Sequence, residues 1–149
     1  MARRHPLVAA TSDAGGFVAD TAPLVYRLER SASPEVLEAV DALFDEVEHG
    51  RIGCLVSTIV AAEFLVRPYR VNPRLAPGVD GFLRGPHLGL VAPSLGVAHG
   101  AARLVAKRVL PRLSDAFVAA TAAELGLPLV TADRRLARAV GGLLVQDFA

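Results

Sequence analysis

The stretch Leu113–Asp133, LSDAFVAATAAELGLPLVTAD, decides the predicted fold of this 149-residue chain. Ser114 is a candidate helix N-cap, and Gly126 has the position of the glycine that ends the same helix. The residues between them are nearly all apolar, which predicts a helix buried on most sides. After Pro128, Leu129–Thr131 has the pattern of a short buried strand. The stretch therefore predicts an interior helix and an interior strand of an α/β sheet.

Two acidic residues border this helix and strand. Asp115 lies in the first turn of the helix, and Asp133 follows the strand, 18 positions later. Ligand sites of open α/β sheets lie at the carboxyl ends of the strands, so the two carboxylates are expected to meet there. Each acid alone has a structural explanation, because an Asp in a first turn favours the helix dipole and an Asp after a strand is a common cap. The argument for a site therefore depends on further acids at matching places.

Two more acids stand at such places. Phe17–Ala19 is predicted to be a strand that ends at Asp20, with Thr21 as the cap of the following helix. Ile52–Ser57 is predicted to be a second strand, and the helix after it carries Glu63 as its one charge in eight residues. A carboxylate on so apolar a helix is costly to bury without a partner. Four acids at one sheet edge would repel one another, and Mg²⁺ or Mn²⁺, which prefer oxygen ligands, would relieve that repulsion.

The remaining segments alternate helices with strands. Helices are predicted over Pro34–His49, Arg74–Leu83, Ser94–Val109 and Arg134–Val140, and strands at Leu90–Val91 and Leu143–Val145. This order predicts a parallel sheet flanked by helices. Residues 1–16 have weak periodicity and are expected to form a mobile, loosely attached extension before a domain over residues 17–149. The amphipathic helix Pro34–His49 is expected to bury further surface in a homodimer.

Composition and charge narrow the class of protein. With 52% hydrophobic residues, 21% charged residues and a net charge of +1, the chain is predicted to be one globular domain. Glu29–Glu48 holds seven acids and one base, whereas Phe64–Ser114 holds eight bases and one acid. Fifteen of the 16 bases are Arg, which suits contact with phosphate, although genomic codon bias explains this preference equally well. The lone Cys54 permits no internal disulfide, and with neither a signal peptide nor a membrane span evident, the cytoplasm is the expected location.

In these segments the sequence resembles the PIN domain family, in particular the VapC-type toxin ribonucleases of toxin–antitoxin systems. The matching segments, in order over about Gly16–Val145, are Val18-Ala-Asp20-Thr21, Ser57-Thr-Ile-Val-Ala-Ala-Glu63, Leu113-Ser-Asp115-Ala-Phe-Val-Ala-Ala-Thr-Ala and Leu127-Pro-Leu-Val-Thr131-Ala-Asp133. The resemblance implies a three-layer α/β fold with a central parallel sheet of four to five strands. It also implies magnesium-dependent cleavage of RNA, homodimers, and inhibition by a small antitoxin protein.

The resemblance also implies roles for individual residues. The acidic quartet that holds the metal and catalyses cleavage is implied to be Asp20, Glu63, Asp115 and Asp133, with Thr21 and Thr131 at polar positions beside it. Cleavage is expected to proceed through a metal-activated water. Contacts to the RNA backbone are expected from Arg67, Arg70, Arg103 and Lys107. The segment Arg67–Gly89 matches no motif of the family.

Two other interpretations compete with the ribonuclease. The first is a catalytically inactive PIN-like module that binds RNA or protein, and the presence of all four acids counts against it. The second is a phosphoacceptor α/β domain such as a receiver or a phosphatase. Such domains have paired acids after the first strand and a late Lys, whereas here Thr21 and Ala22 follow Asp20 and the single Lys is Lys107. The sequence therefore predicts a metal-dependent endoribonuclease.

Overall fold

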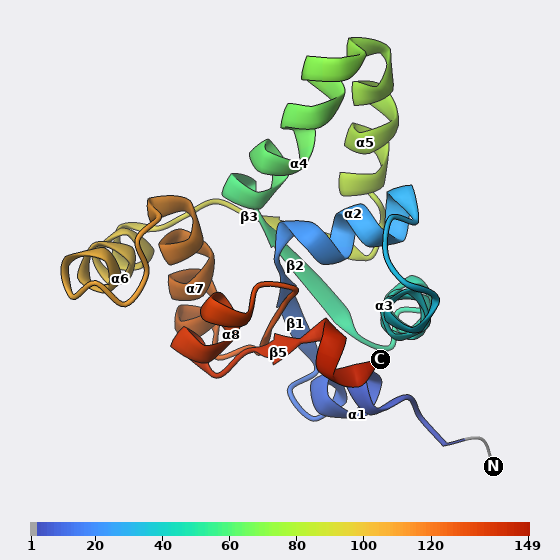
Figure 1. The fold of residues 1–149 in the computed structure, drawn as a ribbon, viewed down its shortest axis with the longest axis horizontal. Helices are drawn as coiled ribbons and strands as arrows, with labels where there is room; N and C mark the ends of the chain where they lie inside the picture. The colour runs from blue at the N-terminus through green and yellow to red at the C-terminus, as the bar shows by residue number, and fades with distance from the viewer. Residues whose placement is uncertain (1–2) are drawn as a thin grey trace.

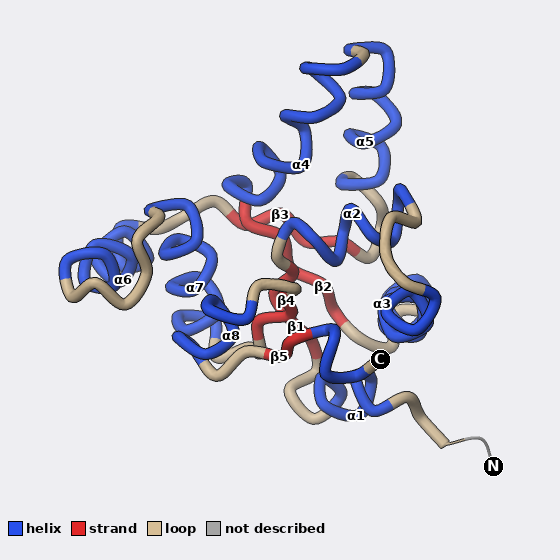
Figure 2. Tube along the Cα trace, in the orientation of Figure 1, coloured by secondary structure: helices blue, strands red, loops and turns tan. Residues whose placement is uncertain are grey.

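A parallel sheet of five strands forms the centre of the computed structural model, which describes residues 3–149 (Figures 1 and 2). The strands are β1 Gly16–Ala19, β2 Gly53–Ser57, β3 Leu88–Val91, β4 Leu129–Thr131 and β5 Leu143–Leu144. They lie in the order β3-β2-β1-β4-β5, and every pair is parallel. The predicted α/β fold, with a central parallel sheet flanked by helices, is therefore confirmed.

Helices surround this sheet. They are α1 Pro6–Ser12, α2 Thr21–Glu29, α3 Pro34–Glu48, α4 Thr58–Val71, α5 Ala76–Leu83, α6 Leu95–Ala106, α7 Leu113–Leu125 and α8 Arg134–Val140, with the 3-10 turns η1 Pro73–Leu75 and η2 Val145–Phe148. Helices α2 and α3 lie on one side of the sheet and α6 and α7 on the other, whereas α4 and α5 form a projecting hairpin (Figure 1). Among residues 3–149, no helix has both the length and the apolar composition needed to cross a membrane.

Strand β1 lies at the centre of the sheet, between β2 and β4. Its register pairs Gly16 with Gly53 and Val18 with Leu129. Position 16 requires glycine, because a Cβ there would lie 2.7 Å from the carbonyl oxygen of Gly53. Since the strands are parallel, the carboxyl ends of β1, β2 and β4 meet at one edge. The residues that follow these strands can therefore share a site.

Helix α3 packs one apolar face onto the core. Its buried residues are Val36, Ala39, Val40, Leu43, Phe44 and Val47. The ring of Phe44 meets the ring of Phe17 in β1 edge to face, with the ring centroids 6.0 Å apart. This apolar face is buried within the chain, and the expected homodimer stays a prediction.

The N-terminal segment differs from the expectation of a loosely attached extension. Residues 6–12 form α1, which His5 caps by accepting a hydrogen bond from the backbone N–H of Leu7. Leu7 and Val8 are buried in the core, with exposed fractions of 0% and 3%. A single two-turn helix is too short to show a clear hydrophobic period, which explains why the sequence pattern missed it. Residues 1 and 2 lie outside the described part of the chain.

Several predicted helix ends move. Helix α4 continues past Val66 through the buried Pro68 to Val71. Helix α6 ends at Ala106 and not at Val109, and Arg108 then adopts a positive φ of 58°. The predicted helix Arg74–Leu83 divides into η1 and α5. These changes leave the order of the predicted helices and strands unaltered.

Helices α2 and α3 are joined through Asp41. Arg27 Nη1 donates to Asp41 Oδ1 at 2.8 Å, and Arg30 Nη2 donates to Asp41 Oδ2 at 2.7 Å. The hydrogen bond from Arg30, together with that from Arg27, holds the pKa of Asp41 below its usual value against the opposing effect of burial. Arg30 makes this contact from a strained C-cap position with φ of 59°.

We predict that Asp41→Asn destabilises the fold at neutral pH and has little effect in acid. The pKa of Asp41 is lower in the native chain than in the unfolded chain, where it is about 3.9. The ionised carboxyl group therefore stabilises the fold at a pH above about 3.9. This stabilisation is lost as the pH falls through the native pKa. The variant should melt about 1–3 °C below the wild type at pH 7. Thermal unfolding between pH 7 and pH 3 measures the difference, with Glu38→Gln on the exposed face of α3 as the control. A difference that does not shrink with falling pH would contradict this account.

Candidate functional site

Asp20 is held at the end of β1 by two hydrogen bonds. It is the N-cap of α2, where its Oδ1 accepts from the backbone N–H of Thr21 at 2.8 Å. Its Oδ2 accepts from the hydroxyl of Thr131 in β4 at 2.7 Å. Burial raises the pKa of Asp20, these two donors oppose the rise, and the neighbouring Asp133 adds to it. The carboxyl group is therefore fixed in position but costly to ionise.

Asp133 is placed by the same threonine. Thr131 is fully buried, and its Oγ1 accepts from the backbone N–H of Asp133 at 3.0 Å. Asp133 is the N-cap of α8, and its Oδ1 accepts from the backbone N–H of Leu136 at 3.1 Å. Thr131 is therefore a positioning residue that contacts the carboxyl group of Asp20 and the backbone of Asp133.

Glu63 and Asp115 are supplied by two helices. Glu63 lies in the second turn of α4, and Asp115 lies in the first turn of α7. Burial raises the pKa of both carboxyl groups, and the charge of Asp20 adds to the rise in each. The hydrogen bonds that residues 3–149 donate to the four acids go to Asp20 and Asp133. The carboxyl oxygens of Glu63 and Asp115 are therefore available to a ligand.

The four predicted acids line one open cleft of about 600 Å³ at the carboxyl edge of the sheet. We call it the carboxylate cleft, and its other lining residues include Thr21, Tyr26 and Arg112. The structure thus brings Asp20, Glu63, Asp115 and Asp133 together from β1, α4, α7 and the start of α8. Thr21 lines the cleft as well, whereas the buried Thr131 does not line it and contacts Asp20 and Asp133 through hydrogen bonds.

Arg112 is the cation among the lining residues of the carboxylate cleft. It is the N-cap residue of α7, and its Nε lies 3.9 Å from Asp115 Oδ2. Its charge opposes the rise that burial causes in the pKa of Asp20, Glu63 and Asp115. The side chain of Arg112 is 69% exposed, so the guanidinium remains accessible to an anionic ligand.

The carboxylate cleft is open and is not a closed ligand cage. Among residues 3–149, no group of three or more His, Cys, Asp or Glu side chains has the spacing of a ready-made metal site. The donors nevertheless fit a divalent cation, because carboxylate and hydroxyl oxygens are the ligands that Mg²⁺ and Mn²⁺ prefer. The Oγ1 of Thr21, at the same cleft, is buried without a hydrogen-bond partner in the described chain. Such a group is costly unless a ligand or a water satisfies it.

Two helix caps at the site differ from the sequence prediction. Ser114 does not cap α7, because Arg112, two residues earlier, takes the cap position with an extended backbone and the helix begins at Leu113. Thr21 does not cap α2, because Asp20 takes that position. The earlier start makes Asp115 the third residue of α7, so its carboxyl group faces the cleft without serving as a cap.

Sequence reasoning missed two lining residues, Arg112 and Tyr26. Arg112 precedes Asp115 by three positions, which at the start of a helix places the two side chains near each other. Tyr26 follows Ala22 by four positions in α2, so both lie on the face that meets the cleft. Its aromatic ring offers a surface on which a nucleobase can stack. Helical spacing was the available signal for both, from Asp115 for Arg112 and from Ala22 for Tyr26.

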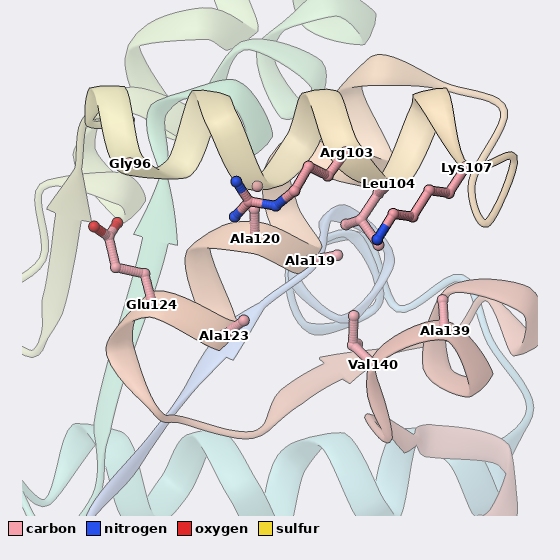
Figure 3. A pocket seen from close by; sticks show the side chains of 11 residues that line it. Gly96, Arg103, Leu104, Lys107, Ala119, Ala120, Ala123, Glu124, Ala139 and Val140 are labelled. Atoms are coloured by element: carbon pink, nitrogen blue, oxygen red, sulfur yellow. The ribbon is translucent and has the colours of Figure 1, made fainter.

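The four cations predicted to contact RNA lie outside the carboxylate cleft. Arg67 of α4 forms an ion pair with Glu29, and Arg70 lies further along the same helix. Arg103 and Lys107 extend from α6 into a groove formed with α7 and α8 (Figure 3). The structure therefore separates these cations into two groups on different elements.

A family model described as the PIN domain matches residues 17–142 of the chain. The chain belongs to the PIN domain family. PIN domains are generally nucleases, and the order of strands and helices described above is that of the PIN fold. Comparison with curated proteins gives no match.

Solved structures share this PIN fold. A toxin–antitoxin complex from Klebsiella pneumoniae is 20% identical with a TM-score of 0.59, over 86% of this chain and 95% of its own. VapBC2 from Rickettsia felis, bound to a promoter DNA fragment, is 17% identical with a TM-score of 0.65, over 87% and 96%. FitAcB from Neisseria gonorrhoeae is 19% identical with a TM-score of 0.64, over 86% and 95%. At these identities the likeness shows the fold.

We predict that Asp115→Asn stabilises the PIN domain in the absence of divalent cations. The substitution keeps the size of the side chain and removes one of four partly buried negative charges that repel one another. Melting in EDTA should occur about 1–3 °C higher than for the wild type. Asp13→Asn, at an exposed position outside the cleft, is the control and should leave the melting temperature unchanged. A lower melting temperature for Asp115→Asn would show that this carboxylate stabilises the fold.

Proposed function

We propose that this PIN domain is a metal-dependent endoribonuclease and the toxin component of a toxin–antitoxin pair. The observation that carries the nuclease proposal is the convergence of Asp20, Glu63, Asp115 and Asp133 on one cleft at the carboxyl edge of the sheet. The toxin part is supported by the three similar structures, each of which is a toxin–antitoxin complex or carries a VapBC or FitAB-type name. RNA as the substrate and the cytoplasm as the location are parts of the same proposal.

In this proposal the acidic quartet holds Mg²⁺ or Mn²⁺, with Thr21 as a further oxygen donor beside it. The bound cation would supply positive charge against the scissile phosphate and the leaving oxygen. The hydrogen bonds from Thr131 and from the start of α2 keep Asp20 in a fixed orientation toward the ligand. The same threonine fixes the backbone of Asp133.

The chain's own residues would also orient the reactants. Glu63 and Asp115, whose carboxyl oxygens are available, are placed to accept the proton of an attacking water. Arg112 faces the cleft with an accessible guanidinium, which suits a non-bridging phosphate oxygen. Tyr26 offers a stacking surface for the base next to the scissile bond.

The partners of the proposed toxin are a cognate antitoxin protein and a second copy of the chain. Large apolar side chains are exposed on α4 and η1, at Val66, Tyr69, Val71 and Leu75. Exposed apolar groups gathered on one projecting hairpin are typical of protein–protein contacts. They support association through α4 and η1.

We predict that the purified protein cleaves single-stranded RNA when Mg²⁺ or Mn²⁺ is added and not in EDTA. Asp20→Asn keeps the size and shape of the side chain beside Thr21 and Thr131 but removes a negatively charged metal ligand. It should lower the cleavage rate by about 100-fold or more. Gel assays on total RNA measure the reaction, with Asp13→Asn as the control. RNA binding without cleavage in the wild type would instead support the catalytically inactive PIN-like module.

We predict products with a 5′-phosphate and a 3′-hydroxyl. Cleavage by the RNA's own 2′-hydroxyl needs a general acid and base, commonly His or Lys, on either side of the phosphate. The lining residues of the carboxylate cleft include no His or Lys, whereas acids suited to taking a proton from water are present. A 2′-deoxy substitution at the cleavage site should slow the reaction modestly and leave the product ends unchanged. Detection of a 2′,3′-cyclic phosphate by mass spectrometry would refute attack by water.

A further inference from the structure

The segment from α6 to α8 carries positive charge that the site described above does not use. Between Leu95 and Val140 there are seven basic residues and three acidic ones. Two of the acids, Asp115 and Asp133, belong to the carboxylate cleft. The third, Glu124, accepts a hydrogen bond from Ser94 at 2.9 Å. The basic residues of this segment are therefore not matched by local acids.

Five of the nine arginines outside this segment form ion pairs with acids, Arg67 with Glu29 among them. Arg27 and Arg30 pair with acids of α3, Arg51 pairs with Glu46, and Arg84 pairs with Asp80. By contrast, within residues 3–149 the ion pairs of the α6–α8 segment are limited to long contacts of 3.9 Å made by Arg112 and Arg134. An exposed surface whose cations lack internal partners favours an anionic ligand.

These cations border two depressions that meet. Arg103 and Lys107 reach from α6 across a groove of about 630 Å³ toward α7 and α8 (Figure 3). Arg134, Arg135 and Arg138 of α8 line a second depression of about 540 Å³. The two depressions share the lining residue Ala139. We call Arg103, Lys107, Arg134, Arg135 and Arg138 the α6–α8 basic surface.

The α6–α8 basic surface continues into the carboxylate cleft at two points. Asp133 lines the cleft, and the next residue, Arg134, lines the second depression. Arg112 lines the carboxylate cleft, and Val109, three residues earlier, lines the second depression. Arg138 lies about 7.5 Å further along α8 than Asp133, at 1.5 Å per residue. A polymer that leaves the cleft on this side therefore meets the arginines of α8 within a few nucleotides.

The lining of both depressions indicates which part of a nucleic acid they accept. Apart from the cations and Glu124, the lining consists of small or aliphatic residues, and it includes no aromatic side chain. Bases are recognised by stacking on aromatic rings, whereas phosphates are recognised by Arg and Lys. The lining of the two depressions therefore fits the sugar–phosphate backbone of a nucleic acid, which it would bind independently of base sequence.

We propose that the α6–α8 basic surface binds the phosphate backbone of single-stranded RNA next to the bond that is cut. This inference rests on the proposed ribonuclease function and adds the path of the substrate outside the carboxylate cleft. It assigns substrate binding to Arg103, Lys107, Arg135 and Arg138. Arg67 of the α4 hairpin contributes little, because it is already paired with Glu29.

The test compares double variants that each remove two positive charges from the full-length protein. Arg135→Gln with Arg138→Gln, and Arg103→Gln with Lys107→Gln, change the basic surface. Arg67→Gln with Arg70→Gln on α4 is the matched control. The affinity for a fluorescein-labelled 20-nucleotide single-stranded RNA of mixed sequence is measured by fluorescence anisotropy in EDTA at several KCl concentrations, so that binding is read without cleavage. Melting temperatures verify that each variant is folded.

Each variant of the basic surface should bind RNA about 5- to 20-fold more weakly at moderate salt, and the slope of log affinity against log salt should fall by about 1.4 for two lost phosphate contacts. The control should stay within about twofold of the wild type. An equal loss of RNA affinity in all three variants would show that the loss depends only on net charge, and it would overturn the assignment of RNA binding to the basic surface. Wild-type RNA affinity in both basic-surface variants would also overturn it and would assign these cations to an acidic protein partner.

The same proteins separate this inference from the proposed function. If the wild type binds RNA through the basic surface but does not cleave it with Mg²⁺, the nuclease proposal fails and the binding surface stands. If the wild type cleaves RNA and both basic-surface variants keep its KM, the nuclease proposal stands and the binding surface is wrong. A raised KM with an unchanged kcat in these variants is the result expected of substrate binding outside the cleft.

Discussion

The hydrogen bond from Thr131 to Asp20 is the contact on which the candidate site depends. It is 2.7 Å long and joins residues 111 positions apart, at the ends of the neighbouring strands β1 and β4. The same hydroxyl oxygen receives the N–H of Asp133, so one buried threonine orients two of the four acids. The hydroxyl of Thr131 is a neutral donor, so it holds the carboxyl group of Asp20 in position without adding a charge to the cleft. The site can therefore stay open to a cation or a phosphate.

The fold places stabilising and functional charges on different helices. On α2 and α3, Arg27 and Arg30 satisfy Asp41, and this lowers the pKa of that acid. At the carboxylate cleft the opposite holds, because burial and mutual repulsion raise the pKa of Asp20, Glu63 and Asp115. Such a site costs stability, and the sheet and the α2–α3 contacts offset that cost.

Much of the fold and the position of the acids could be predicted from local patterns. Asp20 and Asp133 follow short buried strands, and parallel strands bring such residues to one edge whatever the lengths of the connections. Glu63 stood out because it is a single charge on an apolar helix. Helix α1 could not be recognised in this way, because two turns carry too little periodicity and Leu7 is buried only by tertiary packing. Arg112 was missed because its role depends on the exact residue at which α7 begins, and helix ends are poorly defined by sequence.

The order of the strands has a consequence for the chain during its synthesis. Strand β1, near the N-terminus, has β4 as one of its two neighbours, and β4 is separated from it by most of the sequence. A nascent chain that has not yet exposed β4 from the ribosome lacks both Thr131 and Asp133, and its Asp20 has no hydroxyl to orient it. The complete set of acids forms only when the polypeptide as far as Asp133 has left the exit tunnel. An unfinished chain therefore carries an incomplete carboxylate cleft among the RNA molecules that surround it during translation.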